Sequence, residues 1–134
     1  MEIMKKIIKI LVMVIAIFSV GISAYAQTYK YKGNIGEYGV SVTLTEYDMD
    51  CRQGYGCITS VKGKYTYTKA GNTLTLKGFD WTMDNATTLE EYTPKGRHSG
   101  TWELEGLIGD NVLKGSFTNL SNGKVFKVYL KKVK

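Results

Sequence analysis

The chain has 134 residues and contains 15 glycines, 10 tyrosines and a single proline. This mixture favours strands joined by tight turns over helices. The formal net charge is +6, from 18 Lys and Arg against 12 Asp and Glu, and the lysines alternate with other residues instead of clustering. The charge therefore indicates a solvated sheet face and argues against a nucleic-acid partner.

The first 26 residues have the pattern of a cleavable secretory signal peptide. Three lysines near the start precede an apolar run over residues 10–20, and Ala24-Tyr25-Ala26 is typical of a cleavage site. The alternative is a membrane anchor, which needs about 20 consecutive apolar residues. The run is shorter, so we expect a signal peptide over 1–26 and a single all-β domain over 27–134. The product is expected to be periplasmic or secreted.

The two cysteines, Cys51 and Cys57, form an even pair in a chain that is expected to be exported. A disulfide is the usual state of such a pair. A redox pair or half of a metal site is the alternative, but the spacing is not C-x-x-C and the chain has only one histidine. We therefore predict a structural disulfide, and neither a metal nor a cofactor.

Period-two alternation of apolar and polar residues dominates the rest of the chain. It predicts strands near residues 29–35, 38–44, 61–68, 73–77, 101–105, 113–118 and 126–131, with a weaker candidate over 87–93, where Glu90-Glu91 interrupts the pattern. Glycine- and asparagine-rich turns separate these segments, as in hairpins. The predicted fold is all-β, an antiparallel up-and-down meander of about eight strands.

Several glycines fall on the inward parity of the predicted strands. They are Gly33, Gly63, Gly78, Gly106 and Gly115. Inward glycines allow strands to coil tightly, and a meander avoids open edges by closing on itself. The pattern therefore predicts a closed or nearly closed small barrel.

The opening of the domain, from Tyr31 to Tyr38 with Val40, Val42 and Leu44 after it, carries a resemblance. It resembles the opening of small exported β-barrel-like proteins of Bacteroidetes-type bacteria, and the general shape is similar to calycin and avidin-like barrels. The resemblance implies a periplasmic or secreted β-barrel. It carries over no catalytic residue.

No catalytic template is complete in the sequence. His98 is the single histidine and lies in a basic turn, so a Ser-His or Cys-His site would depend on that residue alone. The carboxylate pairs Asp48/Asp50 and Glu90/Glu91 have polar or glycine-rich neighbours, and nothing indicates an apolar pocket around them. The prediction is that the protein is not an enzyme.

A meander places successive connections at alternate ends of the barrel. The two long connections, near residues 48–57 and 80–87, then fall at one end with the turn at 109–111. That end would gather Arg52, Tyr55 and Trp81 with Asp48, Asp50, Asp80, Asp84 and Asp110, and the other end Glu37, Lys69, Lys95, Arg97, His98 and Lys124. The alternative is that these aspartates only stabilise turns.

The favoured function is a non-catalytic binding module. Its contacts would be Arg52, Tyr55 and Trp81, with Asp48, Asp50 and Asp84 around them, because arginine and aromatic residues suit recognition surfaces. The partner would be an extracytoplasmic protein, peptide or glycan, and an inhibitor of an exported hydrolase is one version. The alternative is a carrier that holds a small apolar ligand inside the barrel. A hydrolase or isomerase would need a polar cluster that contains His98.

Overall fold

The computed structural model describes residues 26–134. The predicted signal peptide and its cleavage lie outside these residues, except for Ala26, and stay predictions. Within the described part of the chain, no helix has the length and hydrophobicity needed to cross a bilayer.

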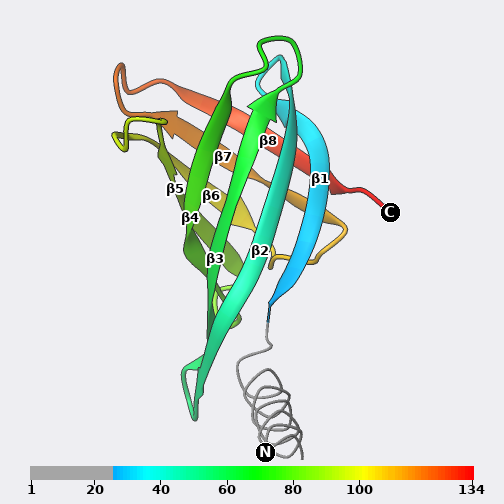
Figure 1. Ribbon diagram of the computed structural model, residues 1–134. Helices are drawn as coiled ribbons and strands as arrows, with labels where there is room; N and C mark the ends of the chain where they lie inside the picture. The colour runs from blue at the N-terminus through cyan, green and yellow to red at the C-terminus, as the bar shows by residue number, and fades with distance from the viewer. Residues whose placement is uncertain (1–25) are drawn as a thin grey trace, which may run out of the picture.

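The described chain forms one closed antiparallel barrel, in which each strand pairs with the next and β8 pairs with β1 (Figure 1). The strands are β1 (Gln27–Ile35), β2 (Tyr38–Arg52), β3 (Gly56–Tyr67), β4 (Thr73–Trp81), β5 (Ala86–Tyr92), β6 (His98–Glu105), β7 (Val112–Asn119) and β8 (Val125–Lys132). The prediction of an eight-stranded meander is confirmed, and so is its closure.

The barrel interior holds the apolar half of each alternating strand. On β2, for example, Val40, Val42 and Leu44 are buried while Ser41 between them is exposed. At the centre, the ring of Trp102 contacts the rings of Tyr65 and Phe117 edge-on, at centroid distances of 5.0 and 5.7 Å. The other buried apolar residues are Tyr31, Ile35, Val61, Leu76, Leu89, Leu104, Ile108, Leu113, Val128 and Leu130. Burying these side chains is the main force that holds the sheet closed.

Inward glycines let neighbouring strands approach closely at four places: Gly33, Gly63, Gly78 and Gly115. A Cβ at any of them would lie 1.8 to 2.1 Å from a backbone oxygen of the adjacent strand, which no side chain can tolerate. These glycines thus permit the tight coiling that closure needs. Gly106 differs from the prediction, because it follows the end of β6 and has a φ of 105°. It turns the chain there.

The weakest predicted strand, residues 87–93, is a full strand, β5. The interruption in its pattern is Glu91, which points inward and is buried. It is therefore an acidic residue on the inward parity of β5, which continues through Glu90-Glu91 to Tyr92.

Two ends of the barrel can be distinguished. The connections β2–β3, β4–β5 and β6–β7 lie at what we call the hairpin end, and the connections β1–β2, β3–β4, β5–β6 and β7–β8 lie at the opposite mouth (Figure 1). The sequence predicted which connections share an end of the barrel. It did not predict that the connection near residues 48–57 is a hairpin. Most of residues 48–57 belong to β2 and β3, which are 15 and 12 residues long and form a projecting hairpin. The connection predicted over 80–87 is also short, since β4 ends at Trp81 and β5 begins at Ala86.

Candidate functional site

The projecting hairpin is held by a covalent link and by hydrogen bonds. Cys51 and Cys57 face each other across β2 and β3 and form the predicted disulfide, with their Cα atoms 4.0 Å apart. The Cys57 amide donates a hydrogen bond to Thr82 Oγ1 at 2.8 Å, and the Thr82 amide donates one to the Cys57 carbonyl at 3.0 Å. The hairpin is therefore fixed both to itself and to the β4–β5 turn.

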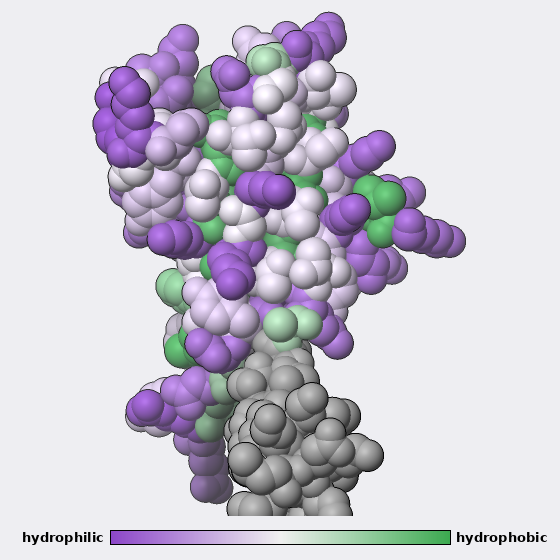
Figure 2. Space-filling view, viewed as in Figure 1, coloured by the Kyte–Doolittle hydropathy of each residue, from purple (hydrophilic) through white to green (hydrophobic). Residues whose placement is uncertain are grey.

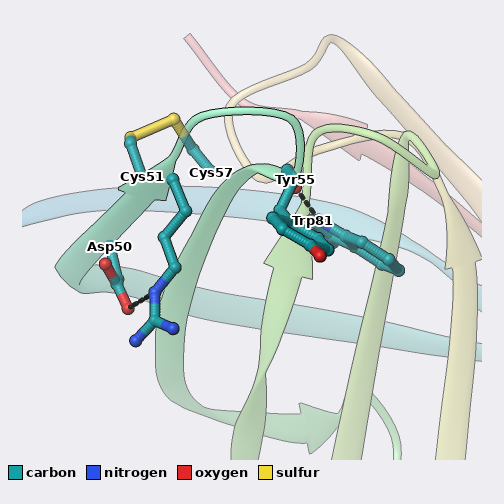
Figure 3. A network of polar contacts seen from close by, with 6 residues as sticks. Asp50, Cys51, Tyr55, Cys57 and Trp81 are labelled. Atoms are coloured by element: carbon teal, nitrogen blue, oxygen red, sulfur yellow. Dashed lines mark hydrogen bonds and ion pairs between the residues drawn. A yellow bond between two sulfur atoms is a disulfide. The ribbon is translucent and has the colours of Figure 1, made fainter.

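Trp81 joins the tip of the hairpin to β4. Its Nε1–H donates a hydrogen bond of 2.6 Å to the carbonyl oxygen of Tyr55, and the two residues lie side by side in Figure 3. Trp81 is half-buried, whereas Tyr55 is 66 % exposed. The bond satisfies the polar atom of the indole and leaves the Tyr55 ring in solvent.

The structure brings only some of the predicted polar contacts together. Arg52 Nε lies 3.4 Å from Asp50 Oδ2, and both side chains are largely exposed (Figure 3). Asp48 sits at the irregular step of β2, with a φ of 53°, and Asp84 lies in the β4–β5 turn. Both are exposed, and no polar contact seen in residues 26–134 joins either of them to Arg52, Tyr55 or Trp81.

Three apolar residues that sequence reasoning missed surround these contacts. Ile58 and Phe79 are each 43 % exposed and Met83 is 58 % exposed. Ile58 pairs directly with Trp81 across β3 and β4, and Phe79 shares the outward face of β4 with Trp81. The outward parity of Phe79 and Ile58 was the signal that could have found them. We call Tyr55, Ile58, Phe79, Trp81 and Met83 the hairpin-end patch.

Exposed large apolar side chains also occur away from the hairpin, at Tyr38, Leu120, Val125 and Tyr129. Figure 2 shows mostly hydrophilic and intermediate residues over the barrel wall in this view, with hydrophobic residues at several separate places. Large apolar side chains left in water at one place on a small protein mark a binding surface more often than a folding requirement.

Asp80 lies at the hairpin end, where the sequence predicted it, but it does not belong to the exposed surface. It lies on the inward face of β4 and is only 3 % exposed. Its Oδ2 accepts a hydrogen bond from the Ile108 amide at 3.1 Å. Burial raises the pKa of Asp80, while hydrogen bonds from Ile108, Glu46 and Thr59 oppose the shift. Glu46 is also buried, so the hairpin end contains an internal carboxyl pair that the sequence analysis did not find.

A second internal carboxyl group lies near the opposite mouth. Glu91 is 4 % exposed; Tyr65 donates a hydrogen bond to its Oε1, and Ser99 donates one of 2.7 Å to its Oε2. Burial raises the pKa of Tyr65, and so does its hydrogen bond to Glu91, so the phenol stays protonated as a donor. The sequence predicted polar or glycine-rich neighbours for Glu90/Glu91, whereas Glu91 is a buried residue of β5.

His98 lies close to this cluster without forming a catalytic relay. Its Nε2 faces the Gly100 carbonyl at 3.0 Å, and its ring stacks on Tyr92. Ser99 Oγ is bonded to Glu91. A Ser-His site requires a hydrogen bond between the serine hydroxyl and the histidine ring. Here Ser99 donates to Glu91, and His98 Nε2 faces the Gly100 carbonyl. Residues 26–134 contain no group of three or more His, Cys, Asp or Glu side chains arranged to hold a metal ion.

Comparisons with known proteins add no relative. No family model matches the chain, and no curated protein and no solved structure matches it either. No enzyme family is therefore identified. The class of protein that the structure itself defines is a small closed eight-stranded antiparallel barrel with one disulfide-linked hairpin.

Proposed function

We propose that the protein is an exported, non-catalytic binding module that recognises an extracytoplasmic protein, peptide or glycan through the hairpin end. One observation carries the proposal: a disulfide-linked hairpin projects from a closed barrel and presents exposed aromatic and aliphatic side chains. Recognition surfaces concentrate their binding energy in a few aromatic and arginine residues. Tyr55, Trp81 and Arg52 are residues of these types.

Rigidity supports the assignment. Binding by a flexible loop loses free energy when side chains and backbone become ordered. Here the disulfide and the two hydrogen bonds between Cys57 and Thr82 order the hairpin before any partner arrives. The ion pair of Arg52 and Asp50 is exposed, so it adds little to stability. The pair places two charged side chains at the hairpin end, near the hairpin-end patch, and this suits a partner whose surface is partly polar.

The disulfide is compatible with an oxidising, extracytoplasmic compartment. Periplasmic or secreted localisation is part of the proposal, together with the signal peptide. An inhibitor of an exported hydrolase is one form that it can take, because a rigid projecting hairpin fits a substrate cleft.

The carrier alternative has less support. An apolar ligand inside the barrel would need an internal void, but the interior positions hold large side chains such as Trp102, Tyr65 and Phe117 in mutual contact. Eight-stranded barrels are narrow enough for side chains to fill.

The test uses partners recovered from the envelope fraction with immobilised wild-type protein. The variant R52A/Y55A/M83A removes exposed side chains and keeps Trp81 and its bond to Tyr55. It should lower affinity for the recovered partner at least about tenfold, equivalent to about 1.4 kcal/mol. Tyr129→Ala is the matched control, since Tyr129 is 50 % exposed on β8. Unchanged affinity of a folded triple variant would refute the site.

A further inference from the structure

The opposite mouth contains a hollow that the proposed function does not use. Its volume is about 380 Å³, and Glu91, Arg97, His98, Ser99 and Asn119 are among the residues that line it. This volume is within the range of about 300 to 1,000 Å³ that small-molecule sites occupy. An irregular step between β5 and β6 at Glu91/Tyr92 shapes it, and such bulges often redirect side chains next to functional sites.

The backbone at this step accommodates the acidic side chain. A Cβ on Gly100 would lie 2.3 Å from the Phe117 ring and 3.1 Å from Glu91 Oε2. Only glycine leaves room there for both groups. Leu120 donates a backbone hydrogen bond of 3.1 Å to the Ser99 carbonyl, which ties the β7–β8 connection to the same step.

Glu91 is chemically unusual because its carboxylate is buried without a positive partner. The two oxygens accept hydrogen bonds from neutral hydroxyl groups, and no ion pair links Glu91 to a Lys, Arg or His within residues 26–134. Buried charges in proteins are normally paired. A carboxylate can accept about four hydrogen bonds, so a further donor can still bind.

The charge distribution in the hollow is dipolar. Glu91 is at its buried wall, and Arg97, a permanent cation, is exposed on the same hollow. A simple cation would be attracted by Glu91 and repelled by Arg97. A simple anion would be attracted by Arg97 and repelled by Glu91. A ligand that carries both charges a short distance apart satisfies both residues.

We propose that the opposite mouth binds a small zwitterion of amino-acid size, with its ammonium group at Glu91 and its carboxylate toward Arg97. The ammonium supplies the missing counter-charge and donates to the free lone pairs of Glu91. The Arg97 guanidinium can hold a carboxylate through two parallel hydrogen bonds. The site is independent of the hairpin end.

The probe is L-alanine, added to ¹⁵N-labelled wild-type protein and followed by amide shifts in NMR spectra. Saturable shifts at Ser99, Gly100 and Leu120 are expected. Methylamine and acetate each carry half of the proposed ligand and should bind at least about tenfold more weakly. Glucose tests whether the hollow instead accepts uncharged hydroxyl groups.

Two substitutions assign the charges, with Lys95→Ala in the same connection as the control. Glu91→Gln and Arg97→Ala should each weaken L-alanine binding at least about tenfold, while Lys95→Ala and R52A/Y55A/M83A leave it unchanged. Arg97 is exposed, so its variant stays informative if Glu91→Gln does not fold. No saturable shift in the wild type, shifts confined to other residues, equal binding of methylamine, or tighter binding of glucose would overturn the proposal.

Discussion

Both ends of the barrel place acidic side chains inside the wall, and they accommodate them differently. At the hairpin end, Asp80 and Glu46 lie together, and Asp80 also accepts a hydrogen bond from the Ile108 amide. Near the opposite mouth, Glu91 accepts hydrogen bonds from the hydroxyl groups of Tyr65 and Ser99. The first arrangement consists of two groups of the same charge, which favours a shared proton. The second consists of one carboxyl group with two hydroxyl donors.

The ends also differ in what they expose. The hairpin end buries Asp80 and Glu46, exposes Asp48, Asp50 and Asp84, and leaves tyrosine, methionine and isoleucine side chains in water. The opposite mouth instead opens a hollow onto its buried acid. A protruding apolar surface suits a macromolecular partner, and a polar hollow suits a small ligand. One barrel can therefore carry two separate binding sites without a change of fold.

The largest effect on stability should follow loss of the covalent link, which only the hairpin end has. Replacing both Cys51 and Cys57 with serine should lower the free energy of unfolding by about 2 kcal/mol, because a short cross-linked loop restricts the unfolded chain. Urea denaturation with and without a reductant measures the effect. Reductant should destabilise the wild type by a similar amount and leave the variant unchanged. A wild type insensitive to reductant, with its thiols shown to be free, would contradict the role assigned to the disulfide.

A smaller loss is expected at the opposite mouth. Glu91→Gln replaces charge-assisted hydrogen bonds from Tyr65 and Ser99 with neutral ones, which are weaker by about 1 kcal/mol in total. Chemical denaturation at pH 7 gives the value, and Glu90→Gln on the outward face of the same strand is the control. If the Glu91→Gln protein is more stable than the wild type, the burial of the carboxylate destabilises the fold by more than its hydrogen bonds from Tyr65 and Ser99 stabilise it.

A smaller change in stability, spread over several pH units, is expected from the carboxyl pair of Asp80 and Glu46. Burial raises the pKa of Asp80 above its ordinary value of 3.8. A group with a raised pKa in the folded state stabilises the fold while it is protonated, and that contribution is lost as pH rises through the folded-state pKa. The stability of the wild type relative to Asp80→Asn should therefore fall as the pH rises from about 4 toward 7.

The groups that face Asp80 decide how this experiment is controlled. They are Glu46 from β2, Thr59 from β3, and Ile108 and Asp110 from the β6–β7 connection. Glu46→Gln removes the other member of the pair and should also flatten the pH dependence. Parallel stability curves for wild type and both variants between pH 4 and 7 would exclude a shared proton.

The smallest effect on stability is expected at the exposed tip. Tyr55→Ala should leave the thermal midpoint within experimental error, because the side chain is in solvent and only its backbone oxygen bonds to Trp81. Trp81→Phe keeps the ring and removes the donor, and it should shift the midpoint more. If Tyr55→Ala proves more destabilising than Trp81→Phe, the tyrosine ring has a structural role and its exposure does not indicate binding.

The alternation of apolar and polar residues was enough to predict the barrel. It assigned inward positions on seven strands, and the inward glycines predicted tight coiling. The same parity also places Glu46, Asp80 and Glu91 inward, but Asp80 was interpreted as an acid in a turn, Glu91 as part of an interruption in a strand, and Glu46 was not interpreted at all. Polar residues inside a sheet are stable only with partners. Those partners come from strands that closure brings together, such as Tyr65 and Ser99 around Glu91.

The candidate site was predicted less completely for a related reason. Arg52, Tyr55 and Trp81 were grouped correctly at one end, since a meander fixes which connections share an end. The extension of β2 and β3 into a hairpin was not predicted, because glycines and polar residues over 48–57 are equally typical of a loop. Ile58 lies at an outward position of β3, and Met83 lies in the β4–β5 turn, to which Cys57 is hydrogen-bonded through Thr82.

The central claim is that the hairpin end meets a partner, and cross-linking in the exporting cell tests it most directly. Tyr55→p-benzoylphenylalanine places a light-activated group on the exposed tip, and the same replacement at Tyr129 is the control. Position 55 should give a discrete adduct that excess wild-type protein suppresses and R52A/Y55A/M83A does not, while position 129 should give none. Adducts from position 129 alone, or equal suppression by both competitors, would contradict recognition through the hairpin.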